Sequence, residues 1–183
     1  VINLSLKSMG NTAYTTALCQ AVSDAIAQGI TVVAAAGNDQ DTDPDLLRYP
    51  ASCNGAISVG ATNSANEITF YSQQNSSVDI AAPGGDGVDR DGDGYVDLVP
   101  AYINDVSISG SAGTSMASPQ VAAAIALMYS VDSSLTPARV ENMLIAGELT
   151  DDAGTSGKDN AFGYGVLNVA KAIENTLEDI SSE

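Results

Sequence analysis

Residues 29–38 have the sequence GITVVAAAGN, and this stretch decides the fold class. Its run from Ile30 to Ala35 is apolar almost throughout and is bounded by Gly29 and Gly37. A strand without alternating polar residues is buried on both faces, which is typical of a parallel sheet covered by helices on each side. The stretch therefore predicts an α/β protein.

Strand-like and helix-like segments alternate on both sides of this run. We expect strands at residues 1–6, 56–59 and 77–82, and helices at residues 13–28, 114–129, 136–144 and 168–177. The alternation predicts three layers, a mostly parallel sheet with helices on both faces. The segment 114–129 is apolar almost all round, which predicts a helix buried in the centre of the protein. No internal repeat or long linker interrupts residues 1–183, so we expect one domain.

The composition excludes several classes of function. The 23 acidic and 6 basic side chains give a formal net charge of −17. Such a surface repels phosphate backbones and anionic lipid, so we expect no nucleic-acid partner and no membrane association. The chain has no histidine, which excludes a self-contained Ser-His-Asp or Cys-His site and the usual imidazole metal ligands.

Two polar residues stand where catalysis would use them. Residues 113–119, GTSMASP, place Ser115 at the amino end of the apolar helix, whose partial positive charge stabilises a developing anion. Asn38 follows the buried strand, at the edge where an open parallel sheet carries its active-site crevice, and its amide can donate to an oxyanion. The alternatives are a serine N-cap and an ordinary turn after a strand.

Together these motifs resemble the subtilisin-like serine proteases, or subtilases. The matching blocks run over nearly the whole chain, in the family's order: residues 3–6 (NLSL), 35–38 (AAGN), 49–51 with 57–61 (YPA and ISVGA), 113–119 (GTSMASP) and 163–168 (GYGVLN). The resemblance implies a subtilisin-like fold and a serine endopeptidase that works through an acyl-enzyme. The implied substrate is a polypeptide.

The resemblance also implies a role for each matching residue. Ser115 is the nucleophile, and its backbone N–H and the Asn38 amide form the oxyanion hole. Ser5 and Leu6 bind the substrate backbone as an added strand, although Lys7 replaces the family's usual glycine beside them. The wall of the specificity pocket is formed by Ala35, Ala36 and Gly37.

Arg48 precedes the YPA block, a position that the resemblance puts at the base of the S1 pocket. A guanidinium there would favour an acidic P1 side chain through charge-assisted hydrogen bonds. The alternative is that Arg48 pairs with Asp43 or Asp45 nearby.

In the family, the catalytic Asp and His precede the blocks present here. The resemblance therefore implies the carboxyl-terminal portion of a catalytic domain, incomplete at its amino-terminal side and inactive alone. The missing portion of the domain is then a partner, and the exposed sheet edge invites association of copies. We expect a secreted protein, a location that favours a disulfide between Cys19 and Cys53 over two buried thiols.

Residues 84–105 form an acidic loop insertion rich in glycine. Within it, residues 89–97 (DRDGDGYVD) match the first nine positions of an EF-hand-type calcium loop. The expected ligands are the side chains of Asp89, Asp91, Asp93 and Asp97 and the carbonyl of Tyr95. The loop's usual bidentate glutamate is absent, since Pro100 stands there. We expect structural calcium; the alternative is an acidic loop without an ion.

Two other functions remain open at this stage. A sedolisin-type serine-carboxyl peptidase uses glutamate in place of histidine, but its oxyanion residue is an aspartate, whereas this chain has Asn38. A calcium-stabilised binding module or pseudoprotease would keep the scaffold and lose the chemistry. The intact pair of Ser115 and Asn38 argues against such a loss.

Overall fold

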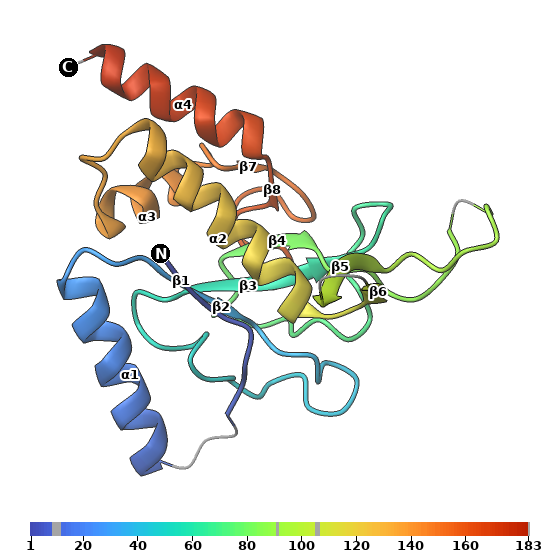
Figure 1. Cartoon of the computed structure of the whole chain (residues 1–183). Helices are drawn as coiled ribbons and strands as arrows, with labels where there is room; N and C mark the ends of the chain where they lie inside the picture. Colours follow the sequence, from blue (N-terminus) through green and yellow to red (C-terminus); the bar gives the residue numbers. More distant parts are fainter. Residues whose placement is uncertain (9–11, 91, 105–106, 183) are drawn as a thin grey trace.

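The computed structural model describes residues 1–8, 12–90, 92–104 and 107–182 (Figure 1). Eight strands and four helices occur in these residues, and most lie close to the segments expected from the pattern. In chain order they are β1 (Ile2–Leu4), α1 (Thr12–Ala27), β2 (Val32–Ala35), β3 (Ile57–Thr62), β4 (Ile80–Pro83), β5 (Val99–Asn104), β6 (Ser107–Ser111), α2 (Thr114–Val131), α3 (Pro137–Ile145), β7 (Thr150–Asp151), β8 (Val166–Leu167) and α4 (Val169–Ser182).

The main sheet has the strand order β1-β2-β3-β4-β8-β7. All neighbours in it are parallel except β7, which pairs antiparallel with β8. The predicted mostly parallel sheet is therefore confirmed. Strand β1 lies at one edge, so its outer backbone groups have no neighbouring strand among the described residues.

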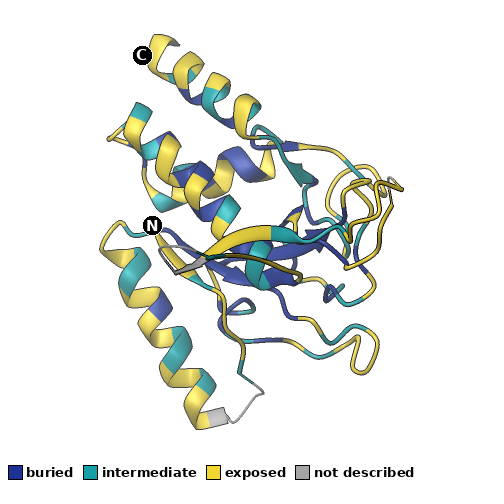
Figure 2. Ribbon diagram, turned by 45° about the vertical axis from the view of Figure 1, so that its right-hand side comes forward, coloured by how far each residue is buried: buried dark blue, intermediate teal, exposed yellow. Residues whose placement is uncertain are grey.

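Successive residues of β2 face opposite layers. Val32 packs in a cluster with Val22 of α1, and Val33 packs in the larger core cluster with Val121 and Ile125 of α2. The two helices therefore cover opposite faces of the sheet, as Figure 1 shows. The expectation of helices on both faces is confirmed. The central strands β2, β3 and most of β4 are buried, whereas the outer sides of α1 and α4 are exposed (Figure 2).

Helix α2 is not buried all round, so that expectation was wrong. Its inner face is buried, but Leu127 on its outer face is 51% exposed. The apolar residues of the outer face form what we call the α2 stripe: Met116, Pro119, Ala123, Ala126 and Leu127. The sheet covers the inner face of the helix. On the stripe, Met116 is half-buried and the other four residues are exposed. No helix in the described part is long and apolar enough to cross a membrane.

The end of the expected acidic loop is a strand. Val99–Asn104 pair antiparallel with Ser107–Ser111, so β5 and β6 form a hairpin beside the amino end of α2 (Figure 1). The expectation of a loop through residue 105 was therefore wrong. Residues 107–111, SISGS, are short, polar and largely exposed, so they carry little of the apolar pattern by which strands are recognised.

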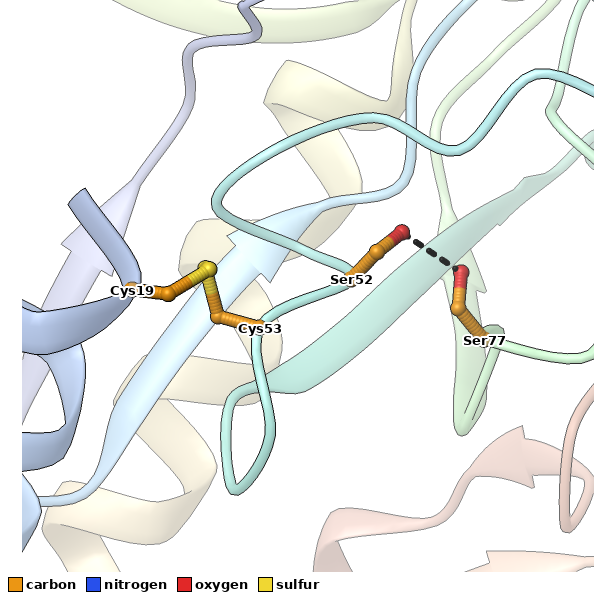
Figure 3. Close-up of a disulfide and its surroundings, with 4 residues drawn as sticks. All are labelled: Cys19, Ser52, Cys53 and Ser77. Carbon is orange, nitrogen blue, oxygen red and sulfur yellow. Dashed lines mark hydrogen bonds between the residues drawn. A yellow bond between two sulfur atoms is a disulfide. The ribbon is translucent and has the colours of Figure 1, made fainter. Parts of the chain in front are cut away.

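Cys19 and Cys53 form a disulfide, with a Cα–Cα distance of 5.1 Å (Figure 3). The bridge joins α1 to the turn before β3. In that turn the backbone N–H of Ser52 donates to the carbonyl of Arg48 at 2.8 Å, and the Ser52 hydroxyl bonds Ser77. The disulfide thus ties α1 to the segment that carries Arg48.

Candidate active site

Ser115 lies in the first turn of α2 and is half-buried. The N-cap is Gly113, with φ at +148°, which has no side chain to cap the helix. The alternative of a serine N-cap was therefore wrong for Ser115. A Cβ at position 113 would lie 3.1 Å from Asn38 Nδ2, so the glycine lets the amide lie close to the helix end.

Asn38 is oriented by the residue next to the nucleophile. Its Oδ1 accepts hydrogen bonds from the Thr114 backbone N–H at 2.9 Å and from the Thr114 hydroxyl at 2.7 Å. With the oxygen held in this way, the Nδ2 group remains as the donor at the amino end of α2. The alternative of an ordinary turn does not account for these bonds to a residue 76 positions away.

Thr114 is the positioning residue that the sequence reasoning missed. Besides its two bonds to Asn38, its Oγ1 accepts from the backbone N–H of Gly37 at 3.3 Å. The side chain is buried, so these bonds form away from solvent. Its position in the GTSMASP motif, next to Ser115, could have marked Thr114 as part of the site. The sequence does not indicate that its partner is Asn38.

The end of β1 lies against the same turn of α2. The Ser5 hydroxyl donates to the backbone carbonyl of Ser115 at 2.9 Å, and the Ser118 hydroxyl donates to Asn3 Oδ1 at 2.6 Å. Leu6 follows and is half-exposed. The two residues expected to bind substrate backbone, Ser5 and Leu6, therefore lie beside the candidate nucleophile.

The end of β2, the strand next to β1, carries Ala35, Ala36 and Gly37, all of which are buried. Gly37 has φ at +115°, and a Cβ there would lie 2.7 Å from Arg48 Cγ. The aliphatic stem of Arg48 therefore packs directly on the glycine, which has no side chain to block it.

Arg48 is only 3% exposed and bonds Asp39, with 3.0 Å between Nη2 and Oδ2. The expected pairing with Asp43 or Asp45 was wrong. Lys7 Nζ bonds both oxygens of the same carboxylate, at 2.6 and 2.5 Å. Burial alone would raise the pKa of Asp39, but Lys7 and Arg48 outweigh it and hold that pKa below its usual value. We call these three residues the Lys7–Asp39–Arg48 cluster.

Comparison with known proteins agrees with this geometry. The model of the Subtilase family matches residues 1–165. The chain belongs to the subtilase family. Minor extracellular protease Epr of Bacillus subtilis is 33% identical over 167 residues, which cover 91% of this chain and 23% of that protein. Subtilisin DY of Bacillus licheniformis is 35% identical over 175 residues, which cover 95% of this chain and 57% of that protein.

Solved structures show the same fold. The structure titled "Crystal Structure of a Lanthipeptide Protease" has a TM-score of 0.77 at 26% identity, over 95% of this chain and 60% of that one. A protease from Pseudoalteromonas arctica has a TM-score of 0.74 at 29% identity, over 96% of this chain and 50% of that one. The subtilase chain thus spans between about a quarter and three-fifths of the proteins that it matches here.

The acidic loop of this subtilase chain is held by its own backbone. The Asp89 carboxylate accepts from the N–H groups of Gly92 at 2.7 Å and Gly94 at 3.0 Å, and Asp93 accepts from the Tyr95 N–H at 2.8 Å. Asp97 accepts from the Ser64 hydroxyl at 2.5 Å. Among the described residues, no three acidic, histidine or cysteine side chains are grouped closely enough to hold a metal. Asp91 lies outside the described residues.

One ion pair in this loop was not anticipated from the sequence. Arg90 bonds Asp86, whose side chain is 1% exposed. Burial alone would raise the pKa of Asp86, but hydrogen bonds from Arg90, from the Val88 N–H and from Asn63 hold it below its usual value. The pair fixes the base of the loop.

A cavity of about 610 Å³ adjoins Ser115. Most of its wall is apolar and comes from the start of β5 and from the α2 stripe; its lining includes Leu98, Val99, Pro100, Met116, Pro119 and Ala123. Asp97 is on the wall, but its carboxylate is bonded to Ser64. The site thus brings together Ser115, the candidate nucleophile, and Asn38, the candidate oxyanion donor, in a chain that has no histidine.

Proposed function

We propose that this chain is the nucleophile-bearing part of a subtilisin-type serine endopeptidase. The observation that carries the proposal is the arrangement of Ser115 and Asn38, which are joined through Thr114 at the amino end of α2. Ser115 Oγ attacks the peptide carbonyl carbon and forms an ester. The peptide nitrogen leaves as an amine, and water then hydrolyses the ester and regenerates the serine.

The oxyanion formed at each step takes hydrogen bonds from Asn38 Nδ2 and from the Ser115 backbone N–H. The amino end of α2 adds its partial positive charge at the same point. The proton of the Ser115 hydroxyl passes to a base and then to the leaving amine. That base is outside this sequence, because the chain contains no histidine. Without it the serine hydroxyl is a weak nucleophile, so we expect the chain alone to be inactive.

We infer that the missing portion of the domain, with the catalytic Asp and His, covers the α2 stripe and the cavity beside Ser115. Three observations support this. The stripe is apolar and exposed, the cavity opens at the residue that needs a base, and relatives such as subtilisin DY extend well beyond the matched part. A second copy of this chain is the competing occupant, and it would give dimers in sedimentation experiments.

The proposed substrate is a polypeptide bound in extended form beside Ser5 and Leu6, as an added strand at the free edge next to β1. The proposed location is outside the cell. The printed names of relatives from Bacillus subtilis and Xanthomonas campestris describe extracellular proteases, and the Cys19–Cys53 disulfide suits an oxidising compartment.

We also propose that calcium stabilises the acidic loop, with Asp89, Asp91, Asp93, Asp97 and the Tyr95 carbonyl as oxygen ligands. The spacing supports this, and so do the backbone N–H groups that orient Asp89 and Asp93. Calcium should raise the melting temperature of the chain, and Asp93→Asn should reduce that rise. Equal melting temperatures in calcium and in EDTA would contradict the proposal.

The test of the main proposal is hydrolysis of an unfolded protein substrate by the complete subtilase. Ser115→Ala should abolish hydrolysis without changing the melting temperature. Ser111→Ala, which changes an exposed serine of β6, should leave hydrolysis unchanged. Peptide binding without cleavage by the unmodified protein would instead support a non-catalytic binding module. Full activity in Ser115→Ala would place the nucleophile elsewhere.

A further inference from the structure

We infer that the Lys7–Asp39–Arg48 cluster binds the carboxylate of an acidic substrate side chain, on the residue that precedes the cleaved bond. The inference rests on the proposed endopeptidase function and names the substrate class that this site would select. It is carried by three features of the cluster: its charge, its unpartnered buried donors and its place beside Asn38.

The charge of the cluster is unbalanced. Lys7 and Arg48 share the single carboxylate of Asp39. By contrast, Arg90 and Lys158 each bond an aspartate, Asp86 and Asp79, that no second cation shares among the described residues. The cluster therefore carries one excess positive charge in a chain whose formal net charge is −17. An incoming carboxylate would balance that charge.

Arg48 has donors that the described residues do not use. Its Nε and Nη1 groups are buried and have no hydrogen-bond partner among the described residues. A buried donor that lacks an acceptor is costly, so each of these two groups favours a nearby acceptor oxygen. They lie on different edges of the guanidinium, and the Nη2 group that would complete a pair of parallel bonds with either of them is bonded to Asp39.

The cluster lies next to the catalytic residues on both sides. Asp39 directly follows the oxyanion donor Asn38, and Lys7 directly follows Leu6 on the proposed substrate edge. The ion pair of Lys7 and Asp39 joins the segment after β1 to the segment after β2. A substrate carbonyl held at Asn38 therefore places the side chain of its own residue against this pair.

The two cations differ in burial: Arg48 is buried, whereas Lys7 is partly exposed. The Arg48 stem packs on Gly37 and forms a buried floor. The Lys7 side chain is 40% exposed, so its ammonium can turn from Asp39 to a ligand while Asp39 keeps its bond to Arg48. A large apolar side chain would bury these cations without an acceptor, so the cluster should reject it.

The experiment uses the complete subtilase and peptides that differ only at the residue before the cleaved bond, as glutamate, glutamine or phenylalanine. Glutamine matches glutamate in shape without its charge. The variants are Lys7→Gln and Arg48→Gln. The matched control is Lys158→Gln, which removes a lysine paired with Asp79 on another part of the surface.

The expected result is a kcat/KM at least about tenfold higher for glutamate than for glutamine, as for a hydrogen-bonded charge pair. Lys7→Gln should reduce that ratio severalfold, whereas Lys158→Gln should leave the ratio unchanged. If Arg48→Gln does not fold, the ratio measured for Lys7→Gln, which changes an exposed side chain, tests the inference by itself. Equal or better cleavage after glutamine or phenylalanine would overturn the inference while the endopeptidase stands. No cleavage of any peptide would overturn the proposed function and the inference with it.

Discussion

The role proposed for Asn38 depends on the orientation of its side-chain amide. Because Thr114 donates to its Oδ1, the amide nitrogen is the part left to donate to the proposed oxyanion. Replacing the equivalent donor in subtilisin lowers kcat about 10²–10³-fold, and we carry that known figure over to Asn38→Ala in the complete subtilase. KM should change little, because the bond forms mainly in the transition state. Steady-state kinetics measure both constants, with Asn54→Ala, in an exposed turn, as the control. A loss confined to KM would contradict the role.

Gly37 supports the site by having no side chain. Its φ of +115° disfavours other residues, and a Cβ would lie 2.7 Å from Arg48 Cγ. We expect Gly37→Ala to lower the free energy of unfolding by about 1–3 kcal/mol, measured by urea denaturation. Gly29→Ala is the matched control, since Gly29 also has a positive φ but has no atom within 4 Å of the added Cβ. Equal losses in the two variants would show that the contact with Arg48 contributes nothing.

Residues in the site differ in how far the sequence predicts them. Ser115 and Asn38 lie in short motifs whose chemistry is local, so the sequence alone singles out both as candidates. Their partners are not local: Thr114 meets Asn38 across 76 positions, and Lys7 meets Asp39 across 32. Arg48 was expected to pair with Asp43 or Asp45, which are closer in sequence, but the turn after β2 brings Asp39 to it instead.

Elements were predictable where their hydrophobic period is strong. The four helices and strands β1 to β4 follow from runs or stripes of apolar residues. In the hairpin, β5 has a short apolar run, but Pro100 within it speaks against a strand, and β6 has no such run. Strands β7 and β8 have two residues each, too few to show a period. The exposed stripe of α2 was missed for another reason, because a helix that is apolar all round gives no sign of which side is covered.

The disulfide links one element to another and closes a loop of 34 residues. A loop of that length should contribute about 3–4 kcal/mol to the free energy of unfolding. The double variant Cys19→Ala with Cys53→Ala should lose that amount in urea denaturation. Adding a reductant should bring the unmodified chain to the same value and leave the double variant unchanged. A double variant as stable as the unmodified chain would contradict this contribution.

The acidic loop makes stability depend on pH through Asp86. Its pKa is below the ordinary value of 3.8 in the folded chain, so the unfolded chain binds more protons as the pH approaches that value. The stabilisation is therefore present above about pH 4 and is lost as the pH falls through the lowered pKa. Asp86→Asn should show a smaller loss of unfolding free energy between pH 7 and pH 3 than the unmodified chain. Glu174→Gln, on α4, is the control, and an unchanged loss in Asp86→Asn would exclude this contribution.

At the scale of the whole molecule, the described part of the chain exposes two surfaces of the kind that other protein segments usually cover. One is the free edge of β1, and the other is the α2 stripe with the cavity beside Ser115. Both adjoin the residues that would carry the reaction. The proposed function, in which the chain is the nucleophile-bearing part of a larger subtilase domain, would explain both surfaces and the lack of a histidine.

Labelling with a fluorophosphonate tests this claim most directly, because the reagent reacts with a serine only when a base activates it. The label is located by intact mass and peptide mapping, on the chain alone and on the complete subtilase. The account predicts rapid labelling of Ser115 in the complete protein and none in the chain alone. Rapid labelling of Ser115 in the chain alone, or labelling of the complete protein at another serine, would contradict it.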